Sequence, residues 1–279
     1  MPHQIGFVDN SVQLAHKAML AAIHAFASSN GWAVLRYETP VDGDHQLILK
    51  GAGFSGLEEI FVGFRTYESA ANDYYNLLAG VFTGYAPSNG FDNQPGAMLS
   101  GVPCHNQRVD YWLTLNPQRI ALAMKVGTPV YESAYVGKFL PYARPGQYPY
   151  PVVCGGMLTG AAATRFSDAS HSMYCKGNRA NLLLRSPTGA LQSFCVPWNT
   201  NYLTGSNGQI RDTDGHYPLM PVDMYHTEQG VFGSLDGIYH VSGFNNTVES
   251  TLVIGGTTYL VMQDVGRTGF SDYYAMRLD

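Results

Sequence analysis

The stretch VDYWLTLNPQRIALAMKV, residues 109–126, decides the fold of this chain. Apolar side chains occupy every second position over residues 109–115 and again over residues 120–126. A period of two is that of a β-strand, and Asn116-Pro117-Gln118 between the two runs is typical of a turn. The stretch therefore predicts a strand–turn–strand hairpin.

An aromatic and proline-rich run follows this hairpin, over residues 131–151. Such a run can form an adhesive surface, a close-packed structural loop or a ligand groove. Aromatic rings give a large contact area at low entropy cost, and prolines lower the entropy lost on assembly. We therefore name its aromatic residues as candidate partner-binding residues: Tyr131, Tyr135, Phe139, Tyr142, Tyr148 and Tyr150.

Outward from the hairpin, the sequence predicts one clear helix and several elements before residue 109. Apolar residues recur at three- and four-residue steps over residues 11–29, with Ser11 as a candidate N-cap and Asn30-Gly31 as the end. His16 and His24 do not have a metal-ligand spacing, and we expect them on the polar face of this helix. The remaining predictions are strands at 32–37, 46–50 and 59–66, a short helix at 68–78, and a long polar loop at 86–101.

The C-terminal part is predicted to consist of short strands between turns, after a small and polar segment at 159–179 that marks a domain boundary. Ile254-Gly255-Gly256-Thr257 is typical of a tight hairpin. We expect an α+β fold that is predominantly β, with antiparallel sheets, one N-terminal packing helix, a domain at 1–160 and a β-rich domain at 161–279. A single domain is the alternative. The predicted strands are 181–185, 193–197, 237–242, 248–254, 257–264 and 273–278.

Composition argues against several classes of function. The net charge is −5 and the Lys and Arg residues are scattered, whereas a nucleic-acid binder needs a basic stripe. No apolar stretch reaches the roughly 18 residues of a membrane span, and the N-terminus lacks a secretion signal. We therefore expect a soluble protein that is made and folded in the cytosol. Only 13% of residues are charged, which favours a surface covered by neighbouring subunits, although a turn-rich monomeric enzyme can have the same composition.

The four cysteines are widely spaced and form no CxxC pair, so the common zinc signatures are excluded. In a cytosolic product we expect reduced and mostly buried thiols. Spacing alone does not decide whether disulfides form later. The residues are Cys104, Cys154, Cys175 and Cys195.

Three motifs resemble nucleotide or nucleophile sites, and each fails on its context. Residues 51–56 match GxGxxG, but a strand-like segment follows where a dinucleotide site needs a helix. Gly53-Phe54-Ser55-Gly56 is one residue short of the GxSxG elbow. Cys104 precedes His105, yet adjacent side chains rarely face each other, so a catalytic thiol is disfavoured.

The sequence gives equally little indication of a metal site or of catalysis by a pair of carboxylates. Residues 211–216 open like a calcium loop but lack the later acidic positions and the closing Glu. A glycosidase needs two carboxylates, and nothing singles out a pair among the candidates. We therefore expect no catalytic, cofactor-binding or metal residues. The candidate carboxylates are Glu58, Glu59, Asp92, Asp110 and Glu132.

Three long segments resemble structural proteins of tailed bacteriophage virions. They are TLNPQRIALAMKVGTPVYESAYVGKFLPYARPGQYPYPVVCGG at 114–156, EEIFVGFRTYESAANDYYNLLAGVFTGY at 58–85, and VFGSLDGIYHVSGFNNTVESTLVIGGTTYLVMQDVGRTGFSDYYAMRLD at 231–279. The resemblance covers the order of elements along nearly the whole chain and carries no set of functional residues. It implies a place in a virion, in the tail or its baseplate.

Two functions of different class follow. The first is a structural subunit of a phage tail or baseplate that forms a homo-oligomer and docks to other tail proteins, without nucleic acid, cofactor or membrane span. The alternative is a tail protein that binds or cleaves host-surface glycans, with tyrosines as the sugar platform. Receptor-binding fibres often carry repeats and trimeric stalks, and the sequence shows neither, which favours the structural subunit.

Overall fold

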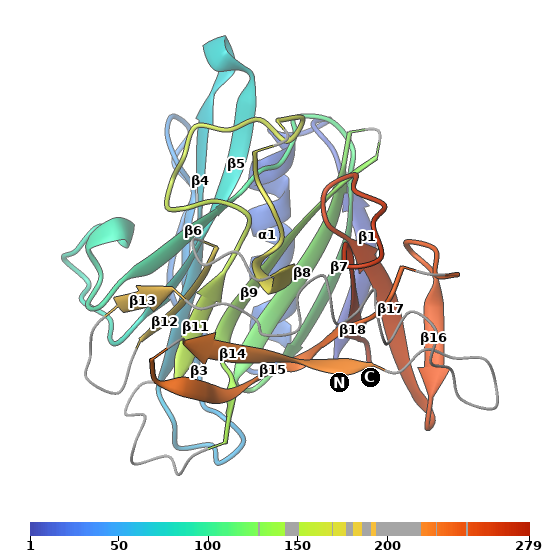
Figure 1. Ribbon diagram of the computed structural model, residues 1–279. Coiled ribbons are helices and arrows are strands. Elements are labelled where there is room, and N and C mark those ends of the chain that lie inside the picture. The colour runs from blue at the N-terminus through green and yellow to red at the C-terminus, as the bar shows by residue number, and fades with distance from the viewer. Residues whose placement is uncertain are drawn as a thin grey trace.

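The computed structural model describes residues 1–127, 129–142, 151–168, 170–176, 181–185, 191–193, 219–226, 228–243 and 245–279. Within these residues the chain forms three antiparallel sheets and one α-helix (Figure 1). The prediction of an α+β fold that is predominantly β is confirmed. No helix in this part of the chain is long and apolar enough to cross a membrane.

The seven-stranded sheet is built around the predicted hairpin at residues 109–126. Strands β7 (Val109–Asn116) and β8 (Arg119–Val126) form the predicted hairpin, closing at Asn116 opposite Arg119. The Asn116 side-chain oxygen accepts hydrogen bonds from the backbone N–H groups of Gln118 and Arg119, which fixes the turn. The strand order is β1 (His3–Val8), β7 (Val109–Asn116), β8 (Arg119–Val126), β9 (Val130–Lys138), β11 (Val152–Gly155), β12 (Leu182–Arg185) and β13 (Leu191–Ser193).

The five-stranded sheet is a meander, and the strands predicted at 32–37 and 46–50 pair in it as an antiparallel hairpin. A strand follows the glycine-rich residues 51–56, as expected, so this segment is a loop between strands. Short 3-10 helices, Ala70–Asn72 and Phe91–Asn93, lie in two of its later connections. The strand order is β2 (Ala33–Glu38), β3 (Gln46–Gly51), β4 (Ile60–Ser69), β5 (Tyr74–Phe82) and β6 (Met98–Val102).

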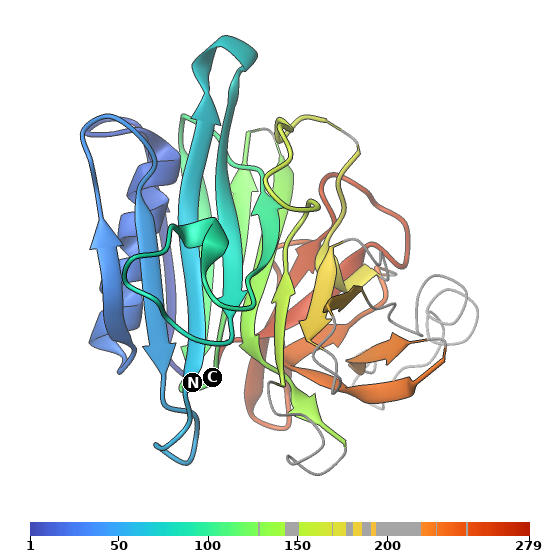
Figure 2. The same cartoon turned by 90° about the vertical axis from the view of Figure 1, so that its left-hand side faces the viewer.

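The third sheet takes its strands mainly from the C-terminal part of the chain (Figure 2). The predicted Gly255-Gly256 hairpin is confirmed, since Ile254 pairs with Thr257 and both glycines have positive φ. Of the predicted strand at 193–197, residues 194–197 lie outside the described residues. The strand order is β10 (Leu140–Pro141), β15 (Gly230–His240), β18 (Tyr273–Arg277), β17 (Thr257–Gln263) and β16 (Thr251–Ile254), and β14 (Met220–His226) also pairs with β15.

The predicted helix is present as α1, but it begins at Ala15 rather than at residue 11. Ser11 does not cap it, because the Ser11 hydroxyl donates to Asp9 instead. The cap comes from the distant Asn106, whose side-chain oxygen accepts a 3.1 Å hydrogen bond from the Ala15 N–H. A cap supplied from the loop before β7 has no local sequence signal.

Helix α1 (Ala15–Ser29) fills the space between β1 and β7 on one side and β2 to β5 on the other, while β9 and β11 pack directly against the five-stranded sheet. Its buried face includes Met19, Leu20 and Ile23. The placement of His16 on the polar face was wrong: this side chain is fully buried, with its Nε2 atom 2.5 Å from Glu68 Oε2. Lys17 also contacts Glu68, so the polar groups at this end of α1 converge on β4.

The helix predicted at 68–78 is wrong, because this segment holds the end of β4, a 3-10 turn and the start of β5. Asp73 takes up the left-handed conformation at the turn, with a φ of 52°. Strand β5 lies between β4 and β6 and is buried on both faces over most of its length, so its side chains show no alternation. The loop predicted at 86–101 contains the strand β6 at its end.

One hydrophobic cluster runs through all three sheets and α1, and it draws residues from both sides of position 160. Strands β12 and β13 also lie beyond this position, yet they belong to the seven-stranded sheet. This arrangement fits the single-domain alternative, while the division at 160 stays a prediction.

Candidate functional site

The six candidate partner-binding residues lie in different surroundings. Tyr131, Tyr135 and Phe139 are buried in the core of the chain, whereas Tyr142 is 61% exposed. Tyr148 and Tyr150 lie outside the described residues. Their predicted role in partner contacts stays a prediction, but three of the six side chains already pack against this chain.

The buried tyrosines link the seven-stranded sheet to the C-terminal sheet region. The Tyr131 hydroxyl donates a 2.6 Å hydrogen bond to Glu249, and the Tyr131 backbone pairs with Val265. The Tyr135 hydroxyl donates to the Lys138 carbonyl and accepts from the Asp236 N–H. Burial raises the pKa of both phenols, so the hydroxyls act as neutral hydrogen-bonding groups. These residues hold the fold together.

Two segments at one end of the molecule carry large apolar side chains that are exposed to solvent. The loop between β3 and β4 and the strand β10 both lie at the lower end in Figures 1 and 2. Leu57 is 89% exposed, Phe54 67% and Leu140 42%. We call these three residues, together with Tyr142, the basal surface.

The backbone beneath the basal surface is held by several bonds. Glu58 in the β3–β4 loop forms a 2.7 Å ion pair with Lys138, the last residue of β9 before β10. The Gly53 N–H donates to the Pro117 carbonyl in the turn of the central hairpin. Tyr142 donates through its hydroxyl to Asp223 and through its N–H to Phe232. The apolar side chains are therefore presented on fixed supports, which lowers the entropy lost when a partner binds.

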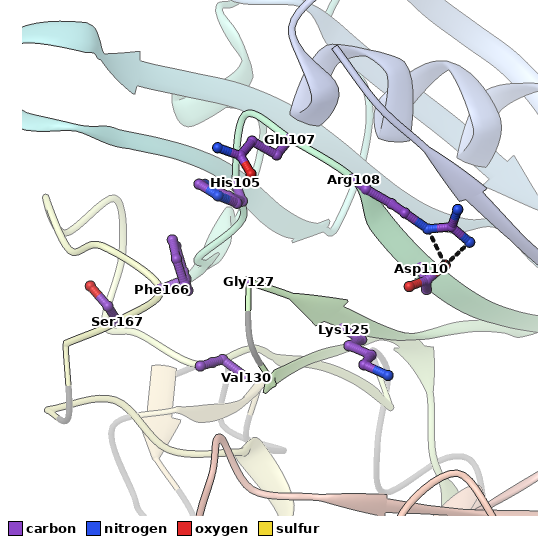
Figure 3. A pocket seen from close by; sticks show the side chains of 9 residues that line it. All are labelled: His105, Gln107, Arg108, Asp110, Lys125, Gly127, Val130, Phe166 and Ser167. Carbon is purple, nitrogen blue, oxygen red and sulfur yellow. Dashed lines mark hydrogen bonds and ion pairs between the residues drawn. The ribbon is translucent and has the colours of Figure 1, made fainter. Parts of the chain in front are cut away.

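A hollow with a volume of about 440 Å³ lies beside the β7–β8 hairpin, at the far end of its strands from the turn (Figure 3). Its cationic groups are mostly paired: Arg108 contacts Asp110 at 2.8 Å, and Lys125 contacts Glu249 at 2.7 Å. Among the described residues that line it, Asp110 is the one carboxylate. The lining residues are His105, Gln107, Arg108, Asp110, Lys125, Gly127, Val130, Phe166 and Ser167.

Each of the candidate glycosidase carboxylates contacts a basic side chain. Glu58 contacts Lys138 and Glu59 contacts Lys50, while Asp92 contacts Arg65. Asp110 contacts Arg108, and Glu132 contacts His171. These contacts indicate structural ion pairs. The sequence 211–216, considered as a calcium loop, lies outside the described residues.

A buried polar cluster, of which the sequence indicated only Glu132, connects the segment 171–176 with the strands around it. Glu132 and His171 are fully buried and 2.8 Å apart. Asp264 accepts hydrogen bonds from the Met173 N–H and from Lys176 and Arg267. The Arg267 guanidinium also donates to the His171 carbonyl, which joins the two parts. We call these groups the buried polar cluster.

The buried polar cluster joins segment 171–176 to Glu132, Asp264 and Arg267 through hydrogen bonds. No group of three or more His, Cys, Asp or Glu side chains in the described part of the chain is arranged to hold a metal ion. His171 lies in a small and polar segment without a recognisable motif. The sequence alone therefore did not indicate that this histidine is buried.

The side chains of Cys104 and His105, which were considered as a catalytic pair, lie in different surroundings. Cys104 is buried, and burial raises the pKa of its thiol to about 12. His105 lines the hollow and lies against the ring of Phe166, with ring centroids 4.5 Å apart. A thiol held in its neutral form is a poor nucleophile. Cys154 and Cys175 are also free and buried, as the sequence predicted.

We expect Cys104, Cys154 and Cys175 to resist alkylation in the folded protein, because burial raises the pKa of all three thiols. Iodoacetamide at pH 8, followed by peptide mapping, should label them at least tenfold more slowly than after unfolding in urea, since only the thiolate reacts. Labelling of the urea-unfolded chain is the control. Rapid modification of Cys104 in the folded chain would contradict its assignment as a buried thiol.

No protein-family model matches this chain, and no curated protein matches it.

Proposed function

We propose that this chain is a structural subunit of a bacteriophage tail or baseplate, which self-associates and docks to neighbouring virion proteins. It is made in the host cytoplasm and resides in the virion tail. The basal surface is the observation that supports this best, because it presents Phe54, Leu57, Leu140 and Tyr142 to solvent on a fixed backbone. Large exposed apolar side chains on rigid supports are typical of contact sites.

Two further features support the proposal. Charged residues are depleted to 13% of the chain, as in proteins whose surface is covered by subunits. The resemblance to phage structural proteins extends over long segments, and it points to the tail. Two residues of the basal surface, Leu140 and Tyr142, also belong to the aromatic and proline-rich run at 131–151.

A double substitution at the basal surface tests the proposal. Phe54→Ser with Leu57→Ser should weaken assembly at least about tenfold, because one apolar anchor contributes on the order of 1.4 kcal/mol or more. Native mass measurements and negative-stain images across a concentration series report the assembled fraction. Both side chains are exposed, so the melting temperature should stay close to that of the unchanged protein.

Val41→Ser is the matched control, because Val41 is 95% exposed in the loop at the opposite end of the five-stranded meander. It should assemble normally. Equal assembly of the control and the double variant would remove the basal surface from the proposal. An unchanged protein that stays monomeric and binds or cleaves host polysaccharide would favour the glycan alternative over the structural role.

A further inference from the structure

Strand β1 forms one edge of the seven-stranded sheet. Its backbone pairs with β7 from His3 opposite Thr114 to Val8 opposite Val109, without a register shift. The Leu115 N–H donates to the Pro2 carbonyl, so the polar groups of alternate residues, starting from Pro2, face β7. The backbone groups of His3, Ile5 and Phe7 therefore face away from the sheet.

These outward groups have no partner from another segment. Among the described residues, no hydrogen bond reaches the backbone of Ile5 or Phe7 from outside the ladder with β7. A row of unpaired N–H and C=O groups is a template for a further strand. The outer edge of β1 can therefore accept a further strand through backbone hydrogen bonds.

Natural proteins block such edges with charges, bulges or covering segments, and both edges of the five-stranded sheet carry these devices. Strand β2 has a register shift between Val34 and Arg36, and it carries the charges of Arg36 and Glu38. Strand β6 is bridged by Gly160 at its outer side through Ser100. Strand β1, HQIGFV, is regular and has no Lys, Arg, Asp or Glu.

The side chains on one face of β1 are also left open. Ile5 is 57% exposed and Phe7 54%. They lie on the same face of the sheet as Trp112 and Asp110, their cross-strand partners on β7. The Arg108 guanidinium covers one side of the Phe7 ring at 4.1 Å, and Asp110 balances its charge. An added strand would bury apolar surface here and would meet no uncompensated charge.

We propose that β1 pairs antiparallel with β1 of a second copy of this chain, which joins two seven-stranded sheets across a twofold axis. This inference rests on the self-association in the proposed function and adds a second contact surface to the basal surface. With Ile5 opposite Ile5 of the second copy, His3 and Phe7 lie opposite each other, and all outward backbone groups find partners. Because β1 has no Lys, Arg, Asp or Glu, two copies of this strand do not repel each other electrostatically. The lack of charge therefore favours a second copy of β1 over a charged partner.

Disulfide trapping tests this register. In a Cys195→Ser background, Ile5→Cys should form a reducible dimer on mild oxidation, because residues opposite each other lie about 5.5 Å apart between Cα atoms, within disulfide range. Val12→Cys is the control, because Val12 is 94% exposed but lies outside β1. We expect at least tenfold more dimer from Ile5→Cys. Equal yields would indicate random collision and would overturn the pairing.

A backbone variant tests the ladder itself. Ile5→Pro removes an N–H group that faces away from β7, so the fold should be retained while self-association weakens at least tenfold. Ile5→Val keeps the N–H and the branched side chain, and should associate normally. Melting curves report whether both variants fold.

The outcomes separate this pairing from the proposed function. If the unchanged chain assembles and Ile5→Pro assembles equally well, the edge pairing is wrong and the structural role stands. If β1 binds a different protein but not a second copy of this chain, the edge pairing is also wrong and the structural role stands. If the unchanged chain remains monomeric at every concentration and does not join tail particles, the proposed function fails, and the pairing fails with it.

Discussion

Replacing His171 with leucine should lower the free energy of unfolding by about 3–5 kcal/mol at pH 8, because the Glu132 carboxylate is then buried without its partner. Glu132 and His171 are both shielded from solvent, and the distance between Glu132 Oε1 and His171 Nε2 is 2.8 Å. Urea unfolding followed by circular dichroism measures the change.

The matched control replaces both members of the pair. In Glu132→Met with His171→Leu, no charge is buried, and much of the lost stability should return, since an apolar pair of similar volume substitutes well for a buried ion pair. If the double variant is less stable than His171→Leu alone, the loss comes from packing, and the interpretation of the pair as a buried polar contact is wrong.

The same pair predicts how stability depends on pH. Burial raises the pKa of Glu132 from 4.5 to about 7. Burial alone lowers the pKa of His171, but the hydrogen bond and charge of Glu132 outweigh this effect and leave the pKa raised. Both groups therefore hold protons more tightly in the folded chain than in the unfolded chain. The stability that Glu132 contributes is complete below about pH 4.5 and is lost as the pH rises through about 7, and the contribution of His171 is likewise lost as the pH rises through its raised pKa.

The free energy of unfolding, measured at pH 5 and at pH 8, tests whether stability falls as the pH rises. The unchanged protein should lose stability between these values, and Glu132→Gln should lose less, because its amide does not titrate. A steeper loss in Glu132→Gln would show that other groups set the pH dependence.

The local patterns of the sequence predicted the hairpins well, because alternation and turn residues act over a few positions. They predicted β5 poorly, since a strand buried on both faces lacks alternation, and they did not indicate β1 at all. Strand β1 is a short edge strand with Gly6 in its middle, and its apolar residues Ile5 and Phe7 face solvent.

The candidate contact residues show why a surface is harder to predict than a strand. Tyr131 and Tyr135 lie on one strand at positions that share a face, which is equally consistent with an exposed platform and a buried one. The residues that contact them, among them Glu249 and Asp236, come from the C-terminal part of the chain, more than 100 positions away. Only the packing of distant segments decides which side chains remain at the surface.

Gly137→Ala should destabilise the protein by about 4 kcal/mol, combining backbone strain of about 1–3 kcal/mol with overpacking of a similar size. Gly137 lies in β9 with a φ of 127°, a conformation that alanine rarely adopts. An added Cβ atom would lie 2.3 Å from the Gln118 carbonyl oxygen and 2.7 Å from the Arg119 Cα atom. Both atoms belong to the backbone of β8 and its turn, so neither can move aside without breaking the register of the central hairpin.

Gly31→Ala separates the two causes. Gly31 also has a positive φ, of 88°, but an added Cβ atom there meets nothing within 4 Å. Its expected cost is the strain alone, about 1 kcal/mol. Thermal and urea unfolding of the two variants should therefore differ by about 3 kcal/mol. Equal destabilisation would mean that β9 shifts to accept the methyl group, and the contact between Gly137 and the Gln118–Arg119 backbone would not be what limits this position to glycine.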